Sequence, residues 1–85
     1  MAGHMFYTYV LESESYPNQR YIGHTEDLRQ RVKDHNGGKT AHTAKYRPWH
    51  VKFYAGFETL ELACAFERYL KSGSGHAFAH RHLGF

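Results

Sequence analysis

A short strand, a glycine and an amphipathic helix follow one another without a break in residues 20–35. An aromatic and a β-branched residue precede Gly23, which is typical of a strand that ends there. Thr25 can then cap a helix whose first turn holds two acids. This succession requires a fold in which a strand leads directly into a helix, and it predicts a helix over Glu26–Asn36.

One face of this helix carries the first indication of a functional site. Leu28, Val32 and His35 fall at i, i+4 and i+7 and form a stripe that faces the core. Arg31 lies on the flank of that stripe, so we expect its cation at the lip where helix and sheet meet. A fixed cation beside a strand that presents Tyr21 is more typical of a functional site than of an ordinary solvent-exposed helix face.

The segment that precedes this run predicts a β-hairpin. Met5–Glu12 alternates as a strand, turn residues follow, and Gln19–His24 is the return strand. With the tip of the hairpin near Ser15, Tyr9 and Tyr21 are expected directly opposite each other.

The C-terminal half predicts one more strand and two more helices. The expected elements are a basic loop over Lys39–Arg47, a strand over Trp49–Ala55, a helix capped by Thr59 that ends near Lys71, a break at Ser72–Gly75 and a helix over His76–Leu83. The side chains expected to point inward from the two helices are Leu62, Ala63, Phe66, Leu70, Ala77, Phe78 and Leu83. We therefore predict an α+β domain, with a three-stranded, mainly antiparallel sheet flanked by helices in the order ββαβαα.

The composition suits one small domain. A chain of 85 residues with 41% hydrophobic content supports a single thin core. Residues 1–4, ahead of Met5, are interpreted as a vector-derived remnant, so the predicted domain covers residues 5–85.

The one cysteine, Cys64, cannot form an internal disulfide, and no stretch approaches the roughly 18 apolar residues of a membrane span. We expect a reduced, cytoplasmic protein with no membrane partner.

Two motifs in this chain resemble those of the GIY-YIG nuclease family. Tyr7-Thr8-Tyr9 stands where the family name has Gly-Ile-Tyr, and Tyr21-Ile22-Gly23 follows twelve residues after Tyr9. Arg31 and His35 complete the second motif. Phe66–Gly73 is similar to the segment in which the family places its metal-binding glutamate. The resemblance covers nearly the whole chain and is to small bacterial single-domain members, of the type found as the N-terminal domain of excision-repair nucleases.

The resemblance implies a metal-dependent endonuclease that hydrolyses phosphodiester bonds in DNA. It assigns Arg31 to the scissile phosphate and Glu67 to one Mg²⁺ or Mn²⁺ ion, and it gives Tyr7 and Gly23 structural roles. A single carboxylate with several waters is a normal way to hold such an ion. The alternative for Glu67 is a surface carboxylate paired with Arg68 or Lys71.

The general base is left open among three side chains. In the family a tyrosine of the paired motifs does this work, which here implies Tyr9 or Tyr21, with a pKa that nearby cations are expected to lower. His35 is the other candidate, because an ordinary pKa of about 6.5 suits a base at neutral pH. His24, His42 and His50 match no position of the family's motif.

The charge of the chain favours a polyanionic partner. A net charge of +3 and a pI near 9.1 give a mild bias in this direction. The cations expected to contact DNA are Lys39, Lys45, Arg47, Lys71 and Arg81. Family members usually take their specificity from an attached DNA-binding domain, for which we expect this chain to have no room. Branched or flapped DNA, or a protein partner that supplies specificity, is therefore implied for a monomer or weak homodimer.

One departure from the family's pattern leads to a second hypothesis about the function of this chain. The family usually completes its site with an asparagine well past the glutamate, but no asparagine follows Glu67. Either a histidine of the tail replaces it or the last catalytic contact is missing. The alternative is therefore a catalytically weak or inactive nucleic-acid-binding module of the same fold, and a third hypothesis is a small protein-interaction domain.

Overall fold

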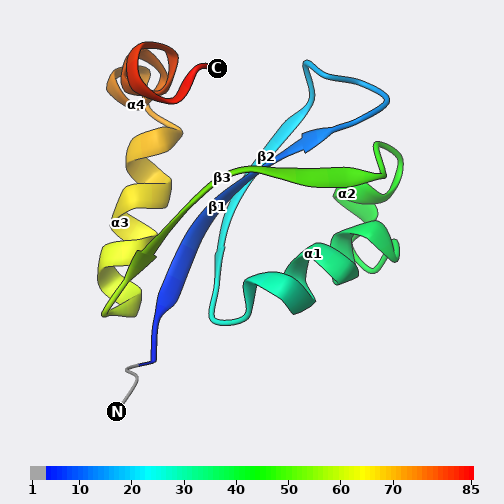
Figure 1. Cartoon of the computed structure of the whole chain (residues 1–85), viewed down its shortest axis with the longest axis horizontal. Helices are drawn as coiled ribbons and strands as arrows, with labels where there is room; N and C mark the ends of the chain where they lie inside the picture. Colours follow the sequence, from blue (N-terminus) through cyan, green and yellow to red (C-terminus); the bar gives the residue numbers. More distant parts are fainter. Residues whose placement is uncertain (1–3) are drawn as a thin grey trace.

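The alternating segment near the N-terminus forms the central strand of the sheet, β1 (Phe6–Ser13). The strands β2 (Arg20–Thr25) and β3 (Trp49–Phe57) lie antiparallel on either side of it, in the order β2-β1-β3 (Figure 1). The computed structural model describes residues 4–85, so most of the predicted N-terminal remnant, residues 1–3, lies outside the described residues. The predicted antiparallel sheet is confirmed, and its third strand is two residues longer than expected.

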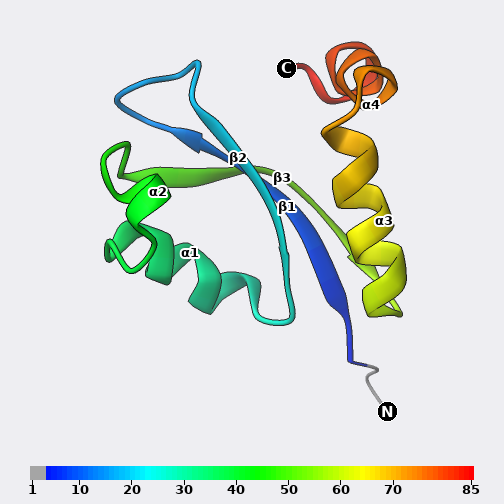
Figure 2. The same ribbon diagram turned by 180° about the vertical axis from the view of Figure 1, so that it is seen from behind.

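Helices cover both faces of this sheet, as the two opposite views in Figures 1 and 2 show. On one side lie α1 (Leu28–Asn36) and α2 (Ala41–Ala44), and on the other lie α3 (Leu60–Leu70), α4 (Gly73–Phe78) and the five-residue π-helix η1 (Ala79–Leu83). The predicted order of elements is confirmed, with α2 as an additional short helix inside the segment expected to be a loop.

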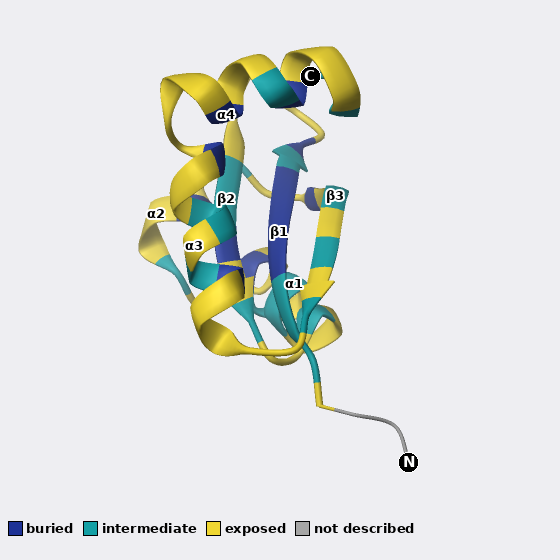
Figure 3. Cartoon of the chain, turned by 90° about the vertical axis from the view of Figure 1, so that its left-hand side faces the viewer, coloured by how far each residue is buried: buried dark blue, intermediate teal, exposed yellow. Residues whose placement is uncertain are grey.

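Alternation along β1 divides its side chains between the two helical layers. Tyr9 and Leu11 form a buried cluster with Trp49, and Leu28 and Val32 of α1 pack against it. Side chains of intervening residues face α3. Figure 3 shows that β1 is buried along most of its length, whereas the outer surfaces of α3 and α4 are exposed. The predicted core stripe of the first helix is therefore confirmed.

The register of the β1–β2 hairpin differs from the expectation. Tyr9 lies opposite Gly23 and not opposite Tyr21. The pairs Tyr9–Gly23 and Glu12–Arg20 centre the hairpin on residue 16, one residue later than the expected tip at Ser15. Because a shift of the tip by one residue displaces the pairing by two, both tyrosines keep the same face but become diagonal neighbours.

The helix α1 begins two residues later than predicted because Asp27, and not Thr25, is its N-cap. The Asp27 carboxylate accepts a hydrogen bond from the backbone N–H of Gln30 at 3.0 Å. The Thr25 hydroxyl accepts from the backbone N–H of Asp27 at 3.1 Å and shapes the turn before the helix. The predicted acids in the first helical turn are therefore absent from it.

The predicted break after α3 is confirmed but is shorter than residues 72–75, because α3 ends at Leu70 and α4 already begins at Gly73, not at His76. The hydroxyl of Ser72 caps α4 and accepts from the backbone N–H of Gly75 at 3.1 Å. A Cβ atom at Gly75 would overlap the carbonyl group of Tyr69. The absence of a side chain there allows α4 to pack directly against the end of α3.

Two of the residues expected in the core are exposed. Leu62 is 52% exposed, and Ala77 also faces solvent, while Ala79 is buried in its place. The side of α3 that meets the sheet carries the buried Ala63, whose carbonyl accepts a hydrogen bond from the Thr8 hydroxyl. Leu62, one residue before Ala63, is turned by about 100° away from that contact.

Candidate active site

The side chain of Tyr9 is the centre of a buried hydrogen-bonded group. Its phenolic oxygen lies 3.0 Å from Nε2 of His35 and accepts a hydrogen bond from Nε of Arg31 at 3.3 Å. The second ring nitrogen of His35, Nδ1, lies 2.8 Å from the hydroxyl oxygen of Thr43. Tyr9, His35 and Thr43 are at most 1% exposed. The structure therefore brings together three of the predicted catalytic residues and adds a threonine to them.

The hydrogen bonds assign the tautomer of His35. The Thr43 hydroxyl donates to the carbonyl of Thr40 at 3.3 Å, so it accepts from Nδ1–H of His35. Nε2 of His35 then carries the lone pair, and the hydroxyl of Tyr9 donates to it. The same phenolic oxygen accepts from Arg31, so Tyr9 is fixed as a donor toward the histidine and an acceptor toward the arginine.

Local structure explains why these side chains meet. Arg31 and His35 are four residues apart on α1 and lie on the same side of the helix. Thr43 belongs to α2, and its carbonyl accepts a 2.9 Å hydrogen bond from Nε1 of the buried Trp49. The short helix that the sequence did not predict thus holds the hydroxyl that orients His35.

Burial and neighbouring charges set the protonation of this group. Burial raises the pKa of Tyr9 to about 12, although the hydrogen bond from Arg31 opposes this effect. The pKa of His35 is lowered by burial and by the positive charge of Arg31. The pKa of Arg31 is raised, mainly by its hydrogen bond to Tyr9. The expectation that cations lower the pKa of Tyr9 is therefore wrong for the protein without a metal ion, because desolvation of the phenolate outweighs them.

Gly23 provides the space in which the two motif tyrosines lie. A Cβ atom at this position would be 2.8 Å from the phenolic oxygen of Tyr9 and 2.9 Å from Cε2 of Tyr21. The rings of Tyr9 and Tyr21 are 6.2 Å apart, and the ring of Tyr21 is 4.7 Å from that of His35. Because Gly23 has no side chain, β2 leaves room for the buried hydroxyl of Tyr9.

Glu67 of α3 approaches the same strand from the other face of the sheet. One carboxylate oxygen lies 2.6 Å from Nδ1 of His24, and the other accepts from Nζ of Lys71 at 2.8 Å. Burial raises the pKa of Glu67, but the hydrogen bonds from Lys71 and His24 outweigh this effect, so that the net pKa is lowered. Glu67 is therefore ionised at neutral pH, and its side chain is 17% exposed.

The two halves of the site meet on consecutive residues of β2. Gly23 faces Tyr9, and His24, the next residue, faces Glu67, because side chains alternate across a strand. Figure 2 shows β2 at the edge of the sheet between α1 and α3. The negative charge of Glu67 also contributes to the raised pKa of Tyr9, so the two groups lie in one electrostatic environment.

The donor set at Glu67 suits a divalent ion that keeps most of its water. Residues 4–85 contain no group of three or more His, Cys, Asp and Glu side chains that could hold a metal ion. An ionised and partly exposed carboxylate still provides one hard oxygen ligand, and Mg²⁺ and Mn²⁺ commonly take their other ligands from water and phosphate. An ion at Oε1 or Oε2 has to displace a hydrogen bond from His24 or Lys71.

Sequence comparison places this arrangement in a family. The profile of the GIY-YIG catalytic domain matches residues 5–78. The chain belongs to the GIY-YIG family. A UPF0213 protein of Streptococcus pyogenes serotype M5 (strain Manfredo) is 38% identical over 66 residues, which cover 76% of this chain and 70% of that protein. The predicted relation to small bacterial GIY-YIG proteins is thereby confirmed.

A longer relative has a name that refers to activity. The protein named structure-specific endonuclease subunit SLX1 homolog, from Giardia intestinalis (strain ATCC 50803 / WB clone C6), is 38% identical over 65 residues. These residues cover 72% of this chain but only 18% of the Giardia protein. This chain therefore matches less than a fifth of the length of the Giardia protein.

The remaining predicted residues of the GIY-YIG site lie in different parts of the molecule. Lys71 pairs with Glu67, which is the contact that the alternative interpretation of Glu67 as a surface carboxylate predicted. The exposed side chains of Lys39, Lys45 and Arg47 flank α2, and Lys39 pairs with Asp34 at 3.4 Å. The exposed Arg81 belongs to η1, which follows α4 on the other side of the sheet (Figure 1). Their contact with DNA stays a prediction.

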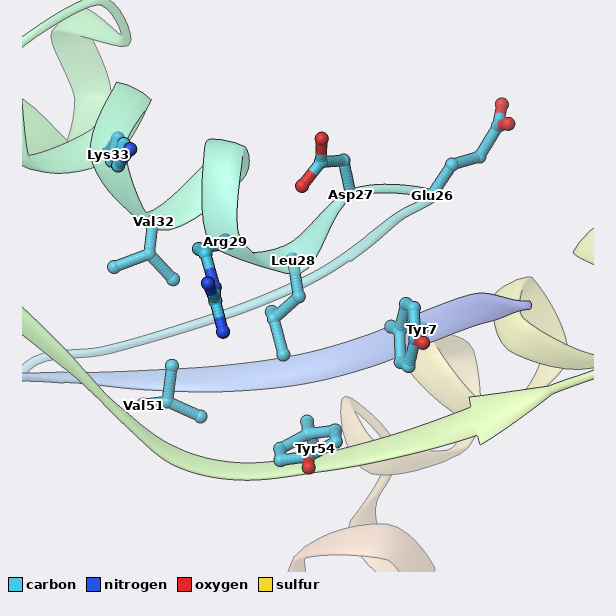
Figure 4. A pocket seen from close by; sticks show the side chains of 9 residues that line it. All are labelled: Tyr7, Glu26, Asp27, Leu28, Arg29, Val32, Lys33, Val51 and Tyr54. Carbon is cyan, nitrogen blue, oxygen red and sulfur yellow. The ribbon is translucent and has the colours of Figure 1, made fainter. Parts of the chain in front are cut away.

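Tyr7 of the first motif lies outside the hydrogen-bonded group of Tyr9, Arg31 and His35. It lines a groove of about 610 Å³ between α1 and β3, together with Leu28, Val32 and Tyr54 (Figure 4). Its ring makes an edge-to-face contact with Tyr54 at 6.1 Å. Tyr9, Arg31, His35 and Glu67 do not line this groove, and the structural role of Tyr7 stays a prediction.

Two residues of the site were not predicted from the sequence. His24 follows Gly23 directly, and the alternation of a strand could have placed it on the face opposite to Tyr9. Its contact with Glu67 joins residues 43 positions apart and has no local signal. Thr43 was included only in a polar loop, although a hydroxyl near a candidate base is a common orienting partner.

None of the helices in the described part of the chain is long and apolar enough to span a membrane.

Proposed function

We propose that this GIY-YIG domain is a divalent-metal-dependent endonuclease that hydrolyses phosphodiester bonds in DNA. The observation that carries the proposal is the position of the Tyr9 hydroxyl, 3.0 Å from His35 Nε2 and 3.3 Å from Arg31 Nε. This hydroxyl lies next to Gly23 of β2, and the following residue, His24, contacts Glu67. A proton acceptor, a fixed cation and an ionised carboxylate are the groups that phosphodiester hydrolysis requires.

In the proposed reaction Tyr9 and His35 act together as the general base. Removing a proton from an isolated phenol with a pKa of about 12 costs about 7 kcal/mol at pH 7. The hydrogen bonds support a relay instead: the Tyr9 oxygen takes a proton from the attacking water while its own proton passes to Nε2 of His35. The base function is thus shared, and the phenolate does not have to accumulate.

Arg31 and Glu67 are proposed to act on the phosphate. The terminal amino groups of Arg31 match two phosphate oxygens and stabilise the charge that develops as the bond to the leaving oxygen breaks. Glu67 would hold the divalent ion, which when bound supplies positive charge to the phosphate and the leaving oxygen. Lys71, on the second oxygen of Glu67, keeps the carboxylate ionised and oriented.

The substrate class is proposed from one relative. The Giardia protein is named for a structure-specific endonuclease subunit, so we propose branched or flapped DNA as the substrate here, in DNA repair or processing. A protein partner that supplies specificity, and action as a monomer or weak homodimer, complete the proposal. A cytoplasmic location is proposed from the single, unpaired Cys64.

The test is cleavage of end-labelled single-stranded, duplex, flap and four-way-junction DNA with Mn²⁺ or Mg²⁺. We expect cleavage by the wild type and its loss in Arg31→Ala and Glu67→Ala, while Arg29→Ala, on the exposed side of α1, serves as the matched control. Cleavage of no substrate by a folded wild type, or equal cleavage by all variants, would contradict the proposal.

A binding module without turnover is the second candidate. Two observations favour it: no asparagine follows Glu67, and both oxygens of Glu67 are already hydrogen-bonded to side chains. It predicts DNA binding whose log affinity falls with log salt, by about 0.9 per phosphate contacted, without any cleavage product. Trp49 fluorescence during a DNA titration at several salt concentrations measures this directly.

A further inference from the structure

The contact between His24 and Glu67 joins an edge strand to a helix at the edge of the catalytic group. Nδ1 of His24 lies 2.6 Å from Oε1 of Glu67, and both side chains are partly exposed, at 42% and 17%. Oε2 of the same carboxylate is held by Lys71. The carboxylate is therefore oriented so that one oxygen faces a lysine and the other faces an imidazole nitrogen.

A buried hydrogen bond next to this pair fixes its geometry. Thr8 lies opposite His24 in the β1–β2 pairing, and its hydroxyl donates to the carbonyl of Ala63 at 2.6 Å. Ala63 and Glu67 are four residues apart on α3, so they share one side of the helix. The Thr8–Ala63 hydrogen bond thus fixes the position of α3 on the sheet close to the contact between Glu67 and His24.

An imidazole nitrogen beside a carboxylate oxygen is a pair of metal ligands. Typical bonds of about 2.1 Å from an ion to a histidine nitrogen and to a carboxylate oxygen allow the two donor atoms to lie close together. In the protein without an ion, a hydrogen bond joins these two atoms, and an ion held by both would take the place of its proton. A carboxylate alone does not discriminate against Mg²⁺, whereas an imidazole ligand favours a transition metal over Mg²⁺.

We propose that His24 and Glu67 together ligate the divalent ion, and that this pair selects a transition-metal ion such as Mn²⁺ over Mg²⁺. The inference rests on the proposed function in one respect, the assignment of the ion to Glu67. Waters and a DNA phosphate complete the coordination. The metal site of this chain then spans β2 and α3, and His24 is its second protein ligand.

The test measures metal binding without cleavage. Free Mn²⁺ is followed by its electron paramagnetic resonance signal during titration into the protein, and Mg²⁺ affinity is measured by competition. We expect the wild type to bind Mn²⁺ more tightly than Mg²⁺, and His24→Ala to raise the Kd for Mn²⁺ about tenfold or more while the Kd for Mg²⁺ changes much less. In nuclear magnetic resonance spectra, Mn²⁺ should broaden the ring signals of His24 first.

His50→Ala is the matched control. His50 also lies on a strand beside a carboxylate, 3.6 Å from Glu12, and its side chain is 45% exposed. Its replacement should leave both affinities unchanged. Circular dichroism of each variant checks that the fold is kept.

The outcomes separate this inference from the function it rests on. If His24→Ala binds Mn²⁺ as tightly as the wild type or more tightly, His24 is a counter-charge that competes with the ion, and the inference is overturned. The absence of Mn²⁺ binding by the wild type overturns it as well. The proposed function fails by a different result, the retention of DNA cleavage in Glu67→Ala, which does not depend on His24.

Discussion

The phenolic oxygen of Tyr9 lies 3.0 Å from Nε2 of His35, and both side chains are fully buried. The bond joins the first strand to the first helix and lies beside the cation of Arg31, which donates to the same oxygen. Each partner satisfies a buried polar group of the other. Substitution of either residue therefore acts on stability and on chemistry, and the two effects need separate measurements.

Replacement of Tyr9 by phenylalanine should remove activity far more than stability. Loss of the hydroxyl leaves Nε2 of His35 without its partner, which is expected to cost about 1–3 kcal/mol of the free energy of unfolding. Loss of the general base should lower the rate of DNA cleavage by about 10²–10⁴. Urea denaturation and single-turnover cleavage measure the two effects, and the exposed Tyr54→Phe is the control. Full activity of Tyr9→Phe would exclude this tyrosine as the base.

The dependence of cleavage on pH distinguishes the relay from a free phenolate. With a pKa of about 12 for Tyr9, a phenolate base predicts a rate that rises tenfold per pH unit from pH 7 to pH 9. The relay requires only neutral His35, whose pKa is lowered by burial and by Arg31. We therefore expect a single-turnover rate that is flat between pH 7 and 9 and falls at acidic pH, as His35 becomes protonated. A steady tenfold rise would contradict the relay.

Stability should fall in acid because of His35. Its pKa is lowered in the folded protein, so above about pH 6.5 the imidazole is neutral in both states and its contribution is complete. Below that pH the unfolded chain binds the proton first, and stability is lost as pH falls toward the folded-state pKa, by up to about 1.4 kcal/mol per pH unit.

The measurement compares urea denaturation of the wild type and His35→Gln at several pH values between 7.5 and 5. The variant should show a shallower loss of stability on acidification, whereas the exposed His42→Gln should keep the slope of the wild type. Identical slopes for wild type and His35→Gln would contradict the assignment of this acid sensitivity to His35.

Replacement of Gly23 by alanine should disturb the site directly. The new Cβ would lie 2.8 Å from the Tyr9 oxygen and 2.9 Å from the Tyr21 ring, so the rings must shift in a packed core. We expect a stability loss of about 1–3 kcal/mol and a loss of cleavage under conditions in which the variant is folded. Gly56→Ala is the control, because its Cβ would first meet the flexible end of Met5, at 3.0 Å. Unchanged cleavage by Gly23→Ala would show that the position of Tyr9 is not critical.

Much of the fold could be predicted from the sequence because its signals are local. The periodicity of Leu28, Val32 and His35 identifies the buried face of α1 and places Arg31 on its flank, and both expectations are confirmed. Thr59 caps α3 as predicted, with its hydroxyl accepting from the backbone N–H of Leu62 at 3.2 Å. The starts of α1 and α4 were placed wrongly because several neighbouring polar residues are able to cap a helix, and the packing around them selects one.

The sequence by itself indicated Tyr9, Arg31 and His35 as candidate site residues, from the first strand and from the strand–glycine–helix run of residues 20–35. Only the tertiary structure decided how they act. Burial of Tyr9 raises its pKa instead of lowering it, because desolvation depends on every element packed around the ring. The approach of α3 to β2 brings His24 to Glu67 across 43 residues of chain, and such a contact depends on how helix and sheet pack, which no local pattern records.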